Sequence, residues 1–256
     1  MTTRSQVLLF PELSERIETS KPVNVASVPQ RSPFRYPGGK TWFVPTFRRW
    51  IKTMTPKPKT LVEPFAGGGI ISLTALFENA VQKAVMAEMD EEIAAVWDSI
   101  VNGEAEWLAN RVLGFELSKE TMLAEIQKTP STQREKAFQT ILKNRTFHGG
   151  ILAKGAGLLK HGENGKGIHS RWYPTTIAKR LINIGYIAHR IDFRCDDGLK
   201  VMQEFAKKRD VIYFIDPPYT AGGKKAGSRL YKYFDLDHER LFTICEMLKS
   251  DFLITI

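Results

Sequence analysis

A strand–turn–helix–strand pattern restricts the fold of this chain more than any other feature. The apolar run at 60–62 predicts a short strand, and residues 65–69 predict a tight, glycine-rich turn. The apolar spacing over 70–79 predicts a helix, and a second strand and helix follow at 83–87 and 91–101. Strands that alternate with helices in this order form parallel sheets, so the sequence predicts an α/β fold.

The same pattern returns near the C-terminus. Strands are expected at 187–194 and at 211–215, with a helix starting at Leu199 between them. A helix over 236–249 and a strand pattern over 252–256 follow, and the chain stops inside that pattern. An open sheet that ends so abruptly is expected to lack its last strands.

The intervening residues have a different composition. Residues 103–142 are rich in Glu, Lys, Leu and Ala and predict helices with a break at Thr129-Pro130. We therefore expect one catalytic α/β domain in two segments, 34–102 and 185–256, with a mostly helical insert at 103–184. Residues 1–33 are expected to form a polar N-terminal arm.

The positive charge is concentrated in the insert. The chain has a net charge of +9, and residues 143–190 hold nine Lys or Arg residues against one acid, Glu163. A solvated face would mix acids with the bases, so this imbalance favours a nucleic-acid partner. The chain has two cysteines and neither a CxxC nor an HExxH motif, so no metal site is predicted. Neither a signal peptide nor an 18-residue apolar run is found, which predicts a cytoplasmic protein without membrane contact.

The turn at 65–69 is a candidate ligand site. Glycines after a strand let a ligand approach the backbone closely, although Gly67 and Gly69 lack the third glycine of a dinucleotide fingerprint. Glu88 ends the next strand 19 residues after Gly69, which is the spacing expected of an acid that binds ribose hydroxyls. The turn alone is compatible with an ordinary strand-to-helix connection, whereas the pair favours a ligand that contains adenosine.

A second candidate site follows the strand at 211–215. Asp216, Pro217 and Pro218 offer a carboxylate and carbonyl acceptors on a rigid backbone, and Tyr219 adds a flat ring. This set suits a planar base with an amino group. The alternative is a strand that ends in a proline turn with an Asp cap.

The stretch 34–41 looks like the end of a phosphate-binding loop. That motif requires glycine where Phe34 stands, and no apolar strand precedes it, so nucleotide triphosphate binding is rejected. Taken alone, the stretch is a helix-entry turn with an exposed lysine.

Four segments in this order resemble the motifs of Dam-type DNA adenine-N6 methyltransferases: 36–40, 63–69, 87–90 and 216–219. Residues 143–145 and 170–174 resemble the family's target-recognition region, so the resemblance covers about 34–256. It implies a Rossmann-like methyltransferase sheet, S-adenosylmethionine as cofactor, no metal, and double-stranded DNA as substrate. It also implies a cytoplasmic enzyme of bacterial or phage origin, with a restriction, phage or housekeeping role left open.

The resemblance assigns roles to particular residues. The expected catalytic residues are Asp216, Pro217, Pro218 and Tyr219. The expected cofactor-binding residues are Tyr36, Gly38, Gly39, Lys40, Glu63, Phe65, Gly67, Gly69, Glu88, Asp197 and Asp216, with Lys40 near the methionine carboxylate. The expected DNA-binding residues are Lys143, Asn144, Arg145, Lys154, Lys160, Lys166, Arg171 and Tyr173. Glu88 departs from the family, which usually has Asp there.

Several alternatives remain at the level of sequence. Asp197 is equally well explained as a helix N-cap before Leu199. A cytosine-N4 methyltransferase would share the fold but usually has Ser where Asp216 stands, and an RNA adenine methyltransferase would share the same four residues. A non-catalytic DNA-binding partner, or a remnant of such an enzyme, is the alternative from another class.

Overall fold

The computed structural model describes residues 27–35, 39–152, 156–162, 165–218 and 236–255. Tyr36, Gly38, Lys154 and Tyr219 were predicted to be functional and lie outside the described residues. In the described part of the chain, no helix combines the length and the apolar character needed to cross a bilayer.

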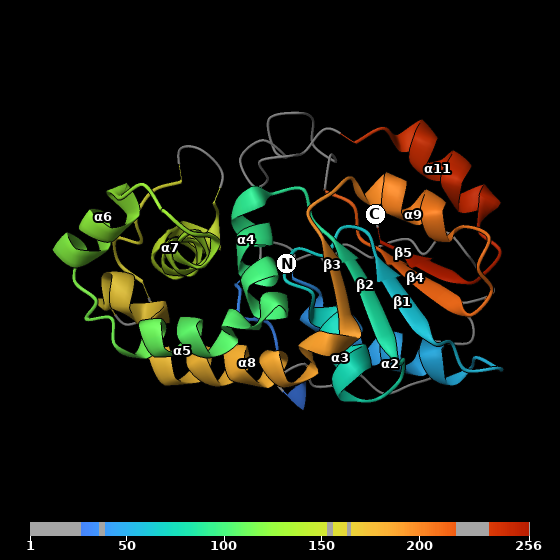
Figure 1. The fold of residues 1–256 in the computed structure, drawn as a ribbon, viewed down its shortest axis with the longest axis horizontal. Coiled ribbons are helices and arrows are strands. Elements are labelled where there is room, and N and C mark those ends of the chain that lie inside the picture. The colour runs from blue at the N-terminus through green and yellow to red at the C-terminus, as the bar shows by residue number, and fades with distance from the viewer. Residues whose placement is uncertain (1–26, 36–38, 153–155, 163–164, 219–235, 256) are drawn as a thin grey trace, which may run out of the picture.

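A five-stranded parallel sheet forms the centre of the α/β part (Figure 1). Its order is β3-β2-β1-β4-β5, and every neighbouring pair is parallel. The strands are β1 (Thr60–Glu63), β2 (Lys83–Ala87), β3 (Ile191–Arg194), β4 (Val211–Ile215) and β5 (Phe252–Ile254). The predicted α/β class and parallel sheet are confirmed, and this architecture is consistent with a methyltransferase fold.

The third strand is shorter than the sequence predicts, because the preceding helix continues further. Helix α8 (Pro174–Ile187) and the short helix η7 (Ala188–Arg190) occupy residues that were expected to start the strand. Arg190 holds this junction in place: its guanidinium donates to the carbonyl oxygens of Leu76, Val81 and Gln82, in and after the helix that precedes β2. Residues 187–190, which were expected in the strand, are therefore helical instead.

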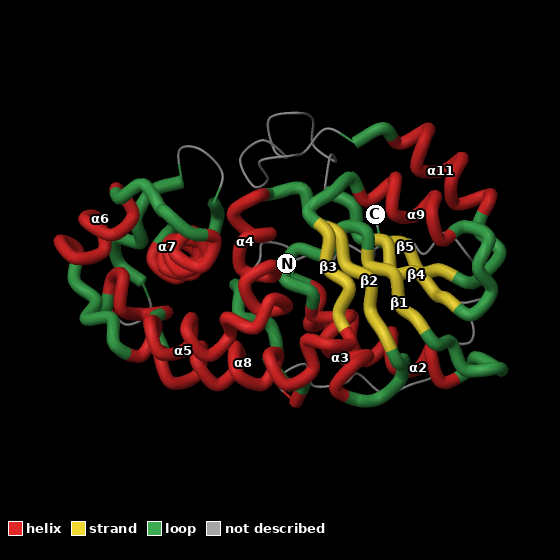
Figure 2. The backbone as a smooth tube through the Cα atoms, in the orientation of Figure 1, coloured by secondary structure: helices red, strands yellow, loops and turns green. Residues whose placement is uncertain are grey.

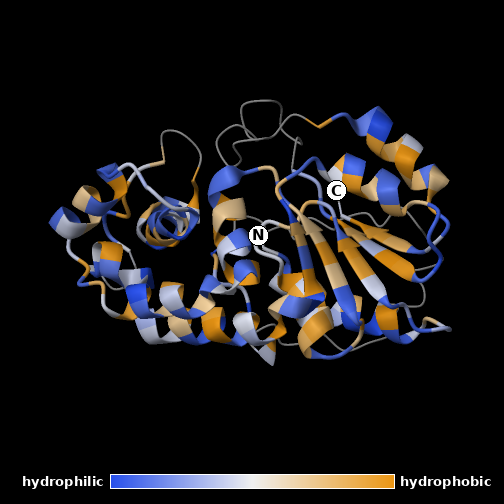
Figure 3. Cartoon of the chain, in the orientation of Figure 1, coloured by the Kyte–Doolittle hydropathy of each residue, from blue (hydrophilic) through white to orange (hydrophobic). Residues whose placement is uncertain are grey.

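Helices cover both faces of the sheet, and the alternating side chains of the strands explain why (Figures 1 and 3). On one face, Leu61, Met86 and Phe214 share a core with α2 (Val44–Lys52), α3 (Ile70–Phe77) and α4 (Glu91–Ser99). On the other face, Val62, Val85 and Tyr213 pack with α9 (Gly198–Phe205) and α11 (His238–Met247). The sheet is thus doubly wound.

The chain between β2 and β3 is mostly helical, as predicted, and lies beside α4 (Figure 2). It contains η3 (Ile100–Glu104), α5 (Ala105–Leu113), α6 (Lys119–Gln127), α7 (Gln133–Thr146), two short helices, η4 (His148–Gly150) and η6 (Gly167–Arg171), and then α8. Capping boxes begin α6 at Ser118 and α7 at Thr132, which places the predicted break around Pro130. Helix α7 packs along α4, and α5 packs along α8. Phe138 and Leu181 belong to the same buried cluster as Trp97 and Phe214, so these helices share a core with the sheet.

The segment 27–35 also packs against the body. Val28 and Phe34 are buried. The Asn144 side chain accepts from the Arg35 backbone N–H at 2.8 Å and donates to the Arg35 carbonyl oxygen at 2.8 Å. Residues 27–33 of the predicted polar arm are therefore part of the structured body. The short helix η2 (Lys40–Phe43) then leads into α2.

Candidate active site

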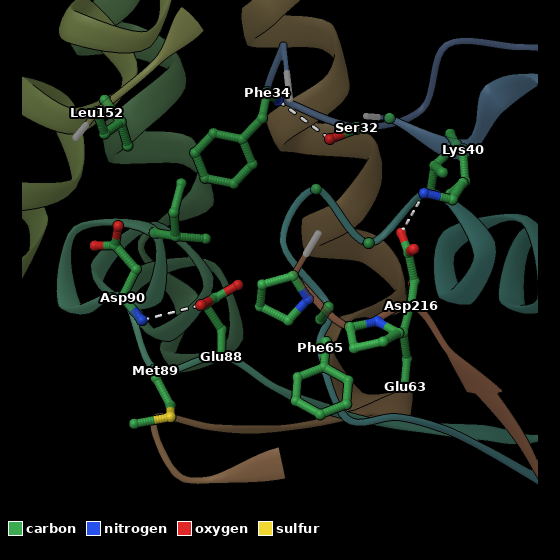
Figure 4. Close-up of a pocket in the computed structure, with 18 of the residues that line it drawn as sticks. Ser32, Phe34, Lys40, Glu63, Phe65, Glu88, Met89, Asp90, Leu152 and Asp216 are labelled. Carbon is green, nitrogen blue, oxygen red and sulfur yellow. Dashed lines mark hydrogen bonds and ion pairs between the residues drawn. The ribbon is translucent and has the colours of Figure 1, made fainter. Parts of the chain in front are cut away.

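A cavity of about 840 Å³ opens at the carboxyl ends of the strands (Figure 4). Strand β1 lies between β2, which follows it in sequence, and β4, so the order of the sheet reverses at β1. Ligands of open α/β sheets bind outside the strand ends at such a reversal. The predicted site residues that line this cavity are Gly39, Lys40, Glu63, Phe65, Gly69, Glu88, Arg145, Tyr173, Asp197, Asp216, Pro217 and Pro218.

The glycine turn after β1 is held in a conformation that few other residues adopt. Gly67 has a φ of 46° and Gly69 a φ of 62°, both in the left-handed region. A Cβ atom on Gly69 would lie 2.5 Å from the Met86 methyl carbon and 2.9 Å from the Trp97 ring. The Trp97 indole N–H donates to the Gly67 carbonyl oxygen at 2.9 Å. The turn is therefore fixed from behind by a buried tryptophan, while its other side lines the cavity.

Glu88 joins the end of β2 to this turn. Its Oε2 accepts from the Gly67 backbone N–H at 3.0 Å, and its Oε1 accepts from the Asp90 backbone N–H at 2.9 Å. Burial raises the pKa of Glu88 to about 7, although these hydrogen bonds act in the opposite direction. A carboxylate in this position still has lone pairs for ligand hydroxyl groups.

Glu63 ends β1 and lies deeper. Its side chain is buried, and Oε2 accepts from the Ser72 backbone N–H in α3 at 3.0 Å. Burial raises the pKa of Glu63 to about 8, and the nearby Asp216 carboxylate adds to this rise. Lys40 opposes it. Glu63 is thus a buried acid between the glycine turn and Asp216.

Asp216 directly follows β4 and is held by two partners, of which Figure 4 shows Lys40. Lys40 Nζ lies 2.7 Å from Asp216 Oδ2, and the Thr255 hydroxyl donates to Asp216 Oδ1 at 2.5 Å. Burial raises the pKa of Asp216 above its ordinary value, and Lys40 opposes the rise. Pro217 and Pro218 follow along the cavity wall and have no backbone N–H, so this wall offers hydrogen-bond acceptors.

Asp197 has the geometry of a helix cap. Its Oδ1 accepts from the Leu199 backbone N–H at 2.9 Å at the start of α9, and its Oδ2 lies 3.2 Å from Arg240 Nη1. The next residue, Gly198, lies so near β1 that a Cβ atom would be 2.0 Å from the Pro64 carbonyl oxygen. The capping alternative predicted for Asp197 is thus observed, and the residue also lines the cavity.

The predicted DNA-binding residues differ in how far they are exposed to solvent. Lys160, Lys166 and Tyr173 are exposed, whereas Arg171 is half-buried. Asn144 and Arg145 are buried instead of lying on the surface, because they fasten residues 33–35 to α7. Lys143 pairs with Glu92 of α4 at 2.5 Å. The concentration of positive charge in residues 143–190 did not predict that Asn144 and Arg145 are buried.

Other residues of the site were missed by the sequence analysis. Trp97, Thr255 and Gly198 each hold a predicted site residue or its neighbour in place. Arg180 of α8 lines the cavity and donates from Nη1 to the Ser32 carbonyl oxygen at 3.0 Å. Their partners are distant in sequence, so no local pattern could identify them.

The residues present fit S-adenosylmethionine. The left-handed glycines leave room where a side chain would clash, and Glu88 stands at the end of the neighbouring strand. A doubly wound parallel sheet with this glycine turn, and with Asp-Pro-Pro directly after a second strand, is consistent with a methyltransferase fold.

Comparison with known families gives a more specific result. Residues 36–147 match the model of the family described as D12 class N6 adenine-specific DNA methyltransferase. This match confirms the predicted resemblance to Dam-type enzymes and supports an adenine-N6 DNA methyltransferase, with DNA as the substrate of the family. A search of curated proteins found no match.

Proposed function

We propose that this chain transfers a methyl group from S-adenosylmethionine to N6 of an adenine in double-stranded DNA. The observation that carries the proposal is the position of Asp216, Pro217 and Pro218 in the same cavity as the glycine turn. This arrangement brings a set of acceptors for an amino group next to a site suited to an adenosine-containing cofactor. The family match over 36–147 supports the same reaction.

The cofactor is held on the β1–β2 side of the cavity. Gly69 allows its close approach, Glu88 accepts from ribose hydroxyls, and Phe65 packs beside it. When bound, S-adenosylmethionine supplies an electrophilic methyl group on a positively charged sulfur. Tyr36, Gly38 and Gly39 cover it, and Asp197 contacts its adenine through Oδ2, the carboxylate oxygen that pairs with Arg240 and does not cap α9.

The adenine amino group is oriented by acceptors at the end of β4. N6 is a poor nucleophile because its lone pair is delocalised into the ring. Hydrogen bonds from its two hydrogens to Asp216 and the Pro217 carbonyl favour a tetrahedral nitrogen, and Tyr219 stacks on the ring. The Lys40 ammonium opposes the rise in the pKa of Asp216 and so favours the carboxylate form, which is the acceptor. Alignment of the amino group with the methyl group supplies much of the rate.

DNA approaches over the basic helices. The target base must leave the duplex to reach Asp216, as it does in enzymes that modify bases. Lys160 and Lys166 are exposed and contact phosphates, and Lys154 and Arg171 join them. Tyr173 is exposed at the cavity and contacts the displaced base or its neighbour.

The test is transfer of a labelled methyl group from S-adenosylmethionine to unmethylated duplex DNA, followed by separation of the nucleosides. Label in N6-methyladenine, lost in Asp216→Asn, is the expected result. Asp196→Asn is the matched control, because Asp196 is an exposed carboxylate that pairs with Lys200. Label in N4-methylcytosine would contradict the adenine assignment, and label only in RNA offered in parallel would contradict the DNA assignment. Cofactor binding without transfer to any nucleic acid would indicate a non-catalytic DNA-binding protein.

A further inference from the structure

Two arginines from different helices line the same cavity. Arg145 lies in the last turn of α7, and its Nη2 donates to the Pro33 carbonyl oxygen. Arg180 lies in α8, and its Nη1 donates to the Ser32 carbonyl oxygen at 3.0 Å. Arg35, which follows in the same segment, lines the cavity with them. Residues from three separate parts of the chain thus bring positive charge to a single wall.

Two of these three arginines lack a carboxylate counter-ion among the described residues. Neither Arg145 nor Arg180 forms an ion pair with a carboxylate in the described part of the chain. Arg145 is only 4% exposed, and its Nε has no hydrogen-bond partner among those residues. Burial, with the charges of Arg180, Arg35 and Arg171, lowers the pKa of Arg145 to about 9.

A buried charge without a counter-ion is unfavourable by several kcal/mol. Each guanidinium has five N–H donors in a planar fork, which matches the oxygen atoms of a phosphate. A phosphate in the cavity would neutralise the charges of Arg145 and Arg180, and it could accept from the Arg145 Nε–H, which has no partner among the described residues. The wall is therefore built for an anion.

We propose that Arg145 and Arg180, together with Arg35, bind a phosphate of the DNA backbone next to the target adenosine. This proposal rests on the proposed function and adds Arg180 to the substrate-binding residues. The site would hold the displaced nucleotide by its phosphate while Asp216 holds its base.

Two observations favour a DNA phosphate over the carboxylate of the cofactor. Arg145 and Arg180 both belong to residues 143–190, where nine cations face one acid, as expected for a polyanionic partner. The wall that they hold contains Ser32 and Phe34, which lie across the cavity from Phe65 and Met89 (Figure 4). Phe65, which is assigned to the cofactor, is thus on the opposite side of the cavity.

The test measures binding of single nucleotides while the cofactor site is filled. The protein is saturated with S-adenosylhomocysteine and titrated by NMR with 2′-deoxyadenosine or with 2′-deoxyadenosine 3′,5′-bisphosphate. The bisphosphate is expected to bind at least about tenfold more tightly, which corresponds to about 1.4 kcal/mol. Because the assay needs no turnover, it is independent of whether methyl transfer occurs.

Arg180→Gln is expected to remove most of this preference, and Arg180→Lys to restore part of it. Lys179→Gln is the matched control, because Lys179 is the exposed neighbour on the same helix and does not line the cavity. The affinity for S-adenosylhomocysteine is measured for each variant, and thermal unfolding confirms that each is folded.

Three outcomes have distinct meanings. Equal affinity of the wild-type protein for the nucleoside and the bisphosphate would overturn the proposal, even if no variant folded. A loss of S-adenosylhomocysteine affinity in Arg180→Gln with the preference intact would also overturn it, because the anion would then be the cofactor's carboxylate. If only 2′-deoxycytidine 3′,5′-bisphosphate bound, the phosphate site would stand and the adenine assignment would fail.

Discussion

Lys40 Nζ and Asp216 Oδ2 lie 2.7 Å apart, although the two residues are far apart in the sequence. Lys40 begins η2, before the first strand of the sheet, and Asp216 directly follows β4. The lysine side chain is 3% exposed and the aspartate side chain 19%. The lysine is thus enclosed behind the carboxylate, which faces the cavity. The pair connects the segment before α2 to the acceptor set for the amino group.

Lys40→Met is expected to impair methyl transfer by removing the cation beside Asp216. Without it, less opposes the rise that burial causes in the pKa of Asp216, so a larger share of the carboxyl group is protonated at a given pH. Activity at pH 7 should fall, by about tenfold for each unit by which the pKa of Asp216 then exceeds 7, and should recover partly as the pH rises. The measurement is a pH–rate profile of the labelled-methyl assay.

Lys59→Met is the control for this substitution, because it also removes a lysine beside an aspartate. Lys59 is exposed, and its Nζ lies 3.8 Å from Asp210 Oδ2. Binding of S-adenosylhomocysteine separates the two roles of Lys40. A variant that lost cofactor affinity and kept the wild-type pH profile would show that Lys40 acts on the cofactor, as the family resemblance implies, and not on Asp216.

Gly69→Ala is expected to destabilise the protein through two separate effects. The left-handed φ costs an alanine about 1 kcal/mol, and contact with Met86 and Trp97 adds about 1–3 kcal/mol. Gly103→Ala isolates the first effect, because Gly103 has a φ of 88° and open space around its Cβ position. Urea unfolding measures both variants. Equal losses of unfolding free energy in Gly69→Ala and Gly103→Ala would mean that the contact with Met86 and Trp97 adds nothing to the destabilisation.

Glu63 is expected to make stability depend on pH. Because the folded state raises its pKa from 4.5 to about 8, folding binds a proton between these values. The contribution of Glu63 to the free energy of unfolding is complete below pH 4.5 and is lost as the pH rises towards 8. The wild-type free energy of unfolding should therefore fall more between pH 5.5 and 8.5 than that of Glu63→Gln.

Glutamine preserves the shape of this side chain and can still accept from the Ser72 N–H. Urea unfolding at the two pH values provides the comparison. Parallel behaviour of the wild type and Glu63→Gln would show that Glu63 is ionised in the folded protein at neutral pH.

Lys160→Gln is expected to weaken DNA binding equally on all sequences. An exposed lysine that contacts one phosphate contributes about 1 unit to the slope of log K against log salt. The measurement is DNA affinity at several salt concentrations, with Lys57→Gln as the control from the exposed loop before β1. A change in sequence preference with an unchanged slope would assign Lys160 to a base.

The sequence predicted those parts of the structure that depend on local pattern. Strands β2 and β4 have the predicted bounds, because each is a short apolar run with clear stops on both sides. Their carboxyl ends meet at one edge in a parallel sheet, so Glu63, Glu88 and Asp216 could be placed around one cavity.

Contacts between distant segments could not be predicted in this way. Asn144 and Arg145 looked like surface residues of a basic stretch, yet they are buried because residues 32–35 pack over α7. Trp97 looked like any apolar residue of a helix, yet its indole N–H fixes the glycine turn. A single sequence contains no pattern that marks such pairings.

Helix α4 has one face on the sheet and the other on α7, and one hydrophobic core runs through both. The helices that follow α4 therefore cannot be exchanged between relatives as a cassette cut at residue 103. A chimaera would keep a well-packed interior only if its donor segment started at α4 and continued through α8.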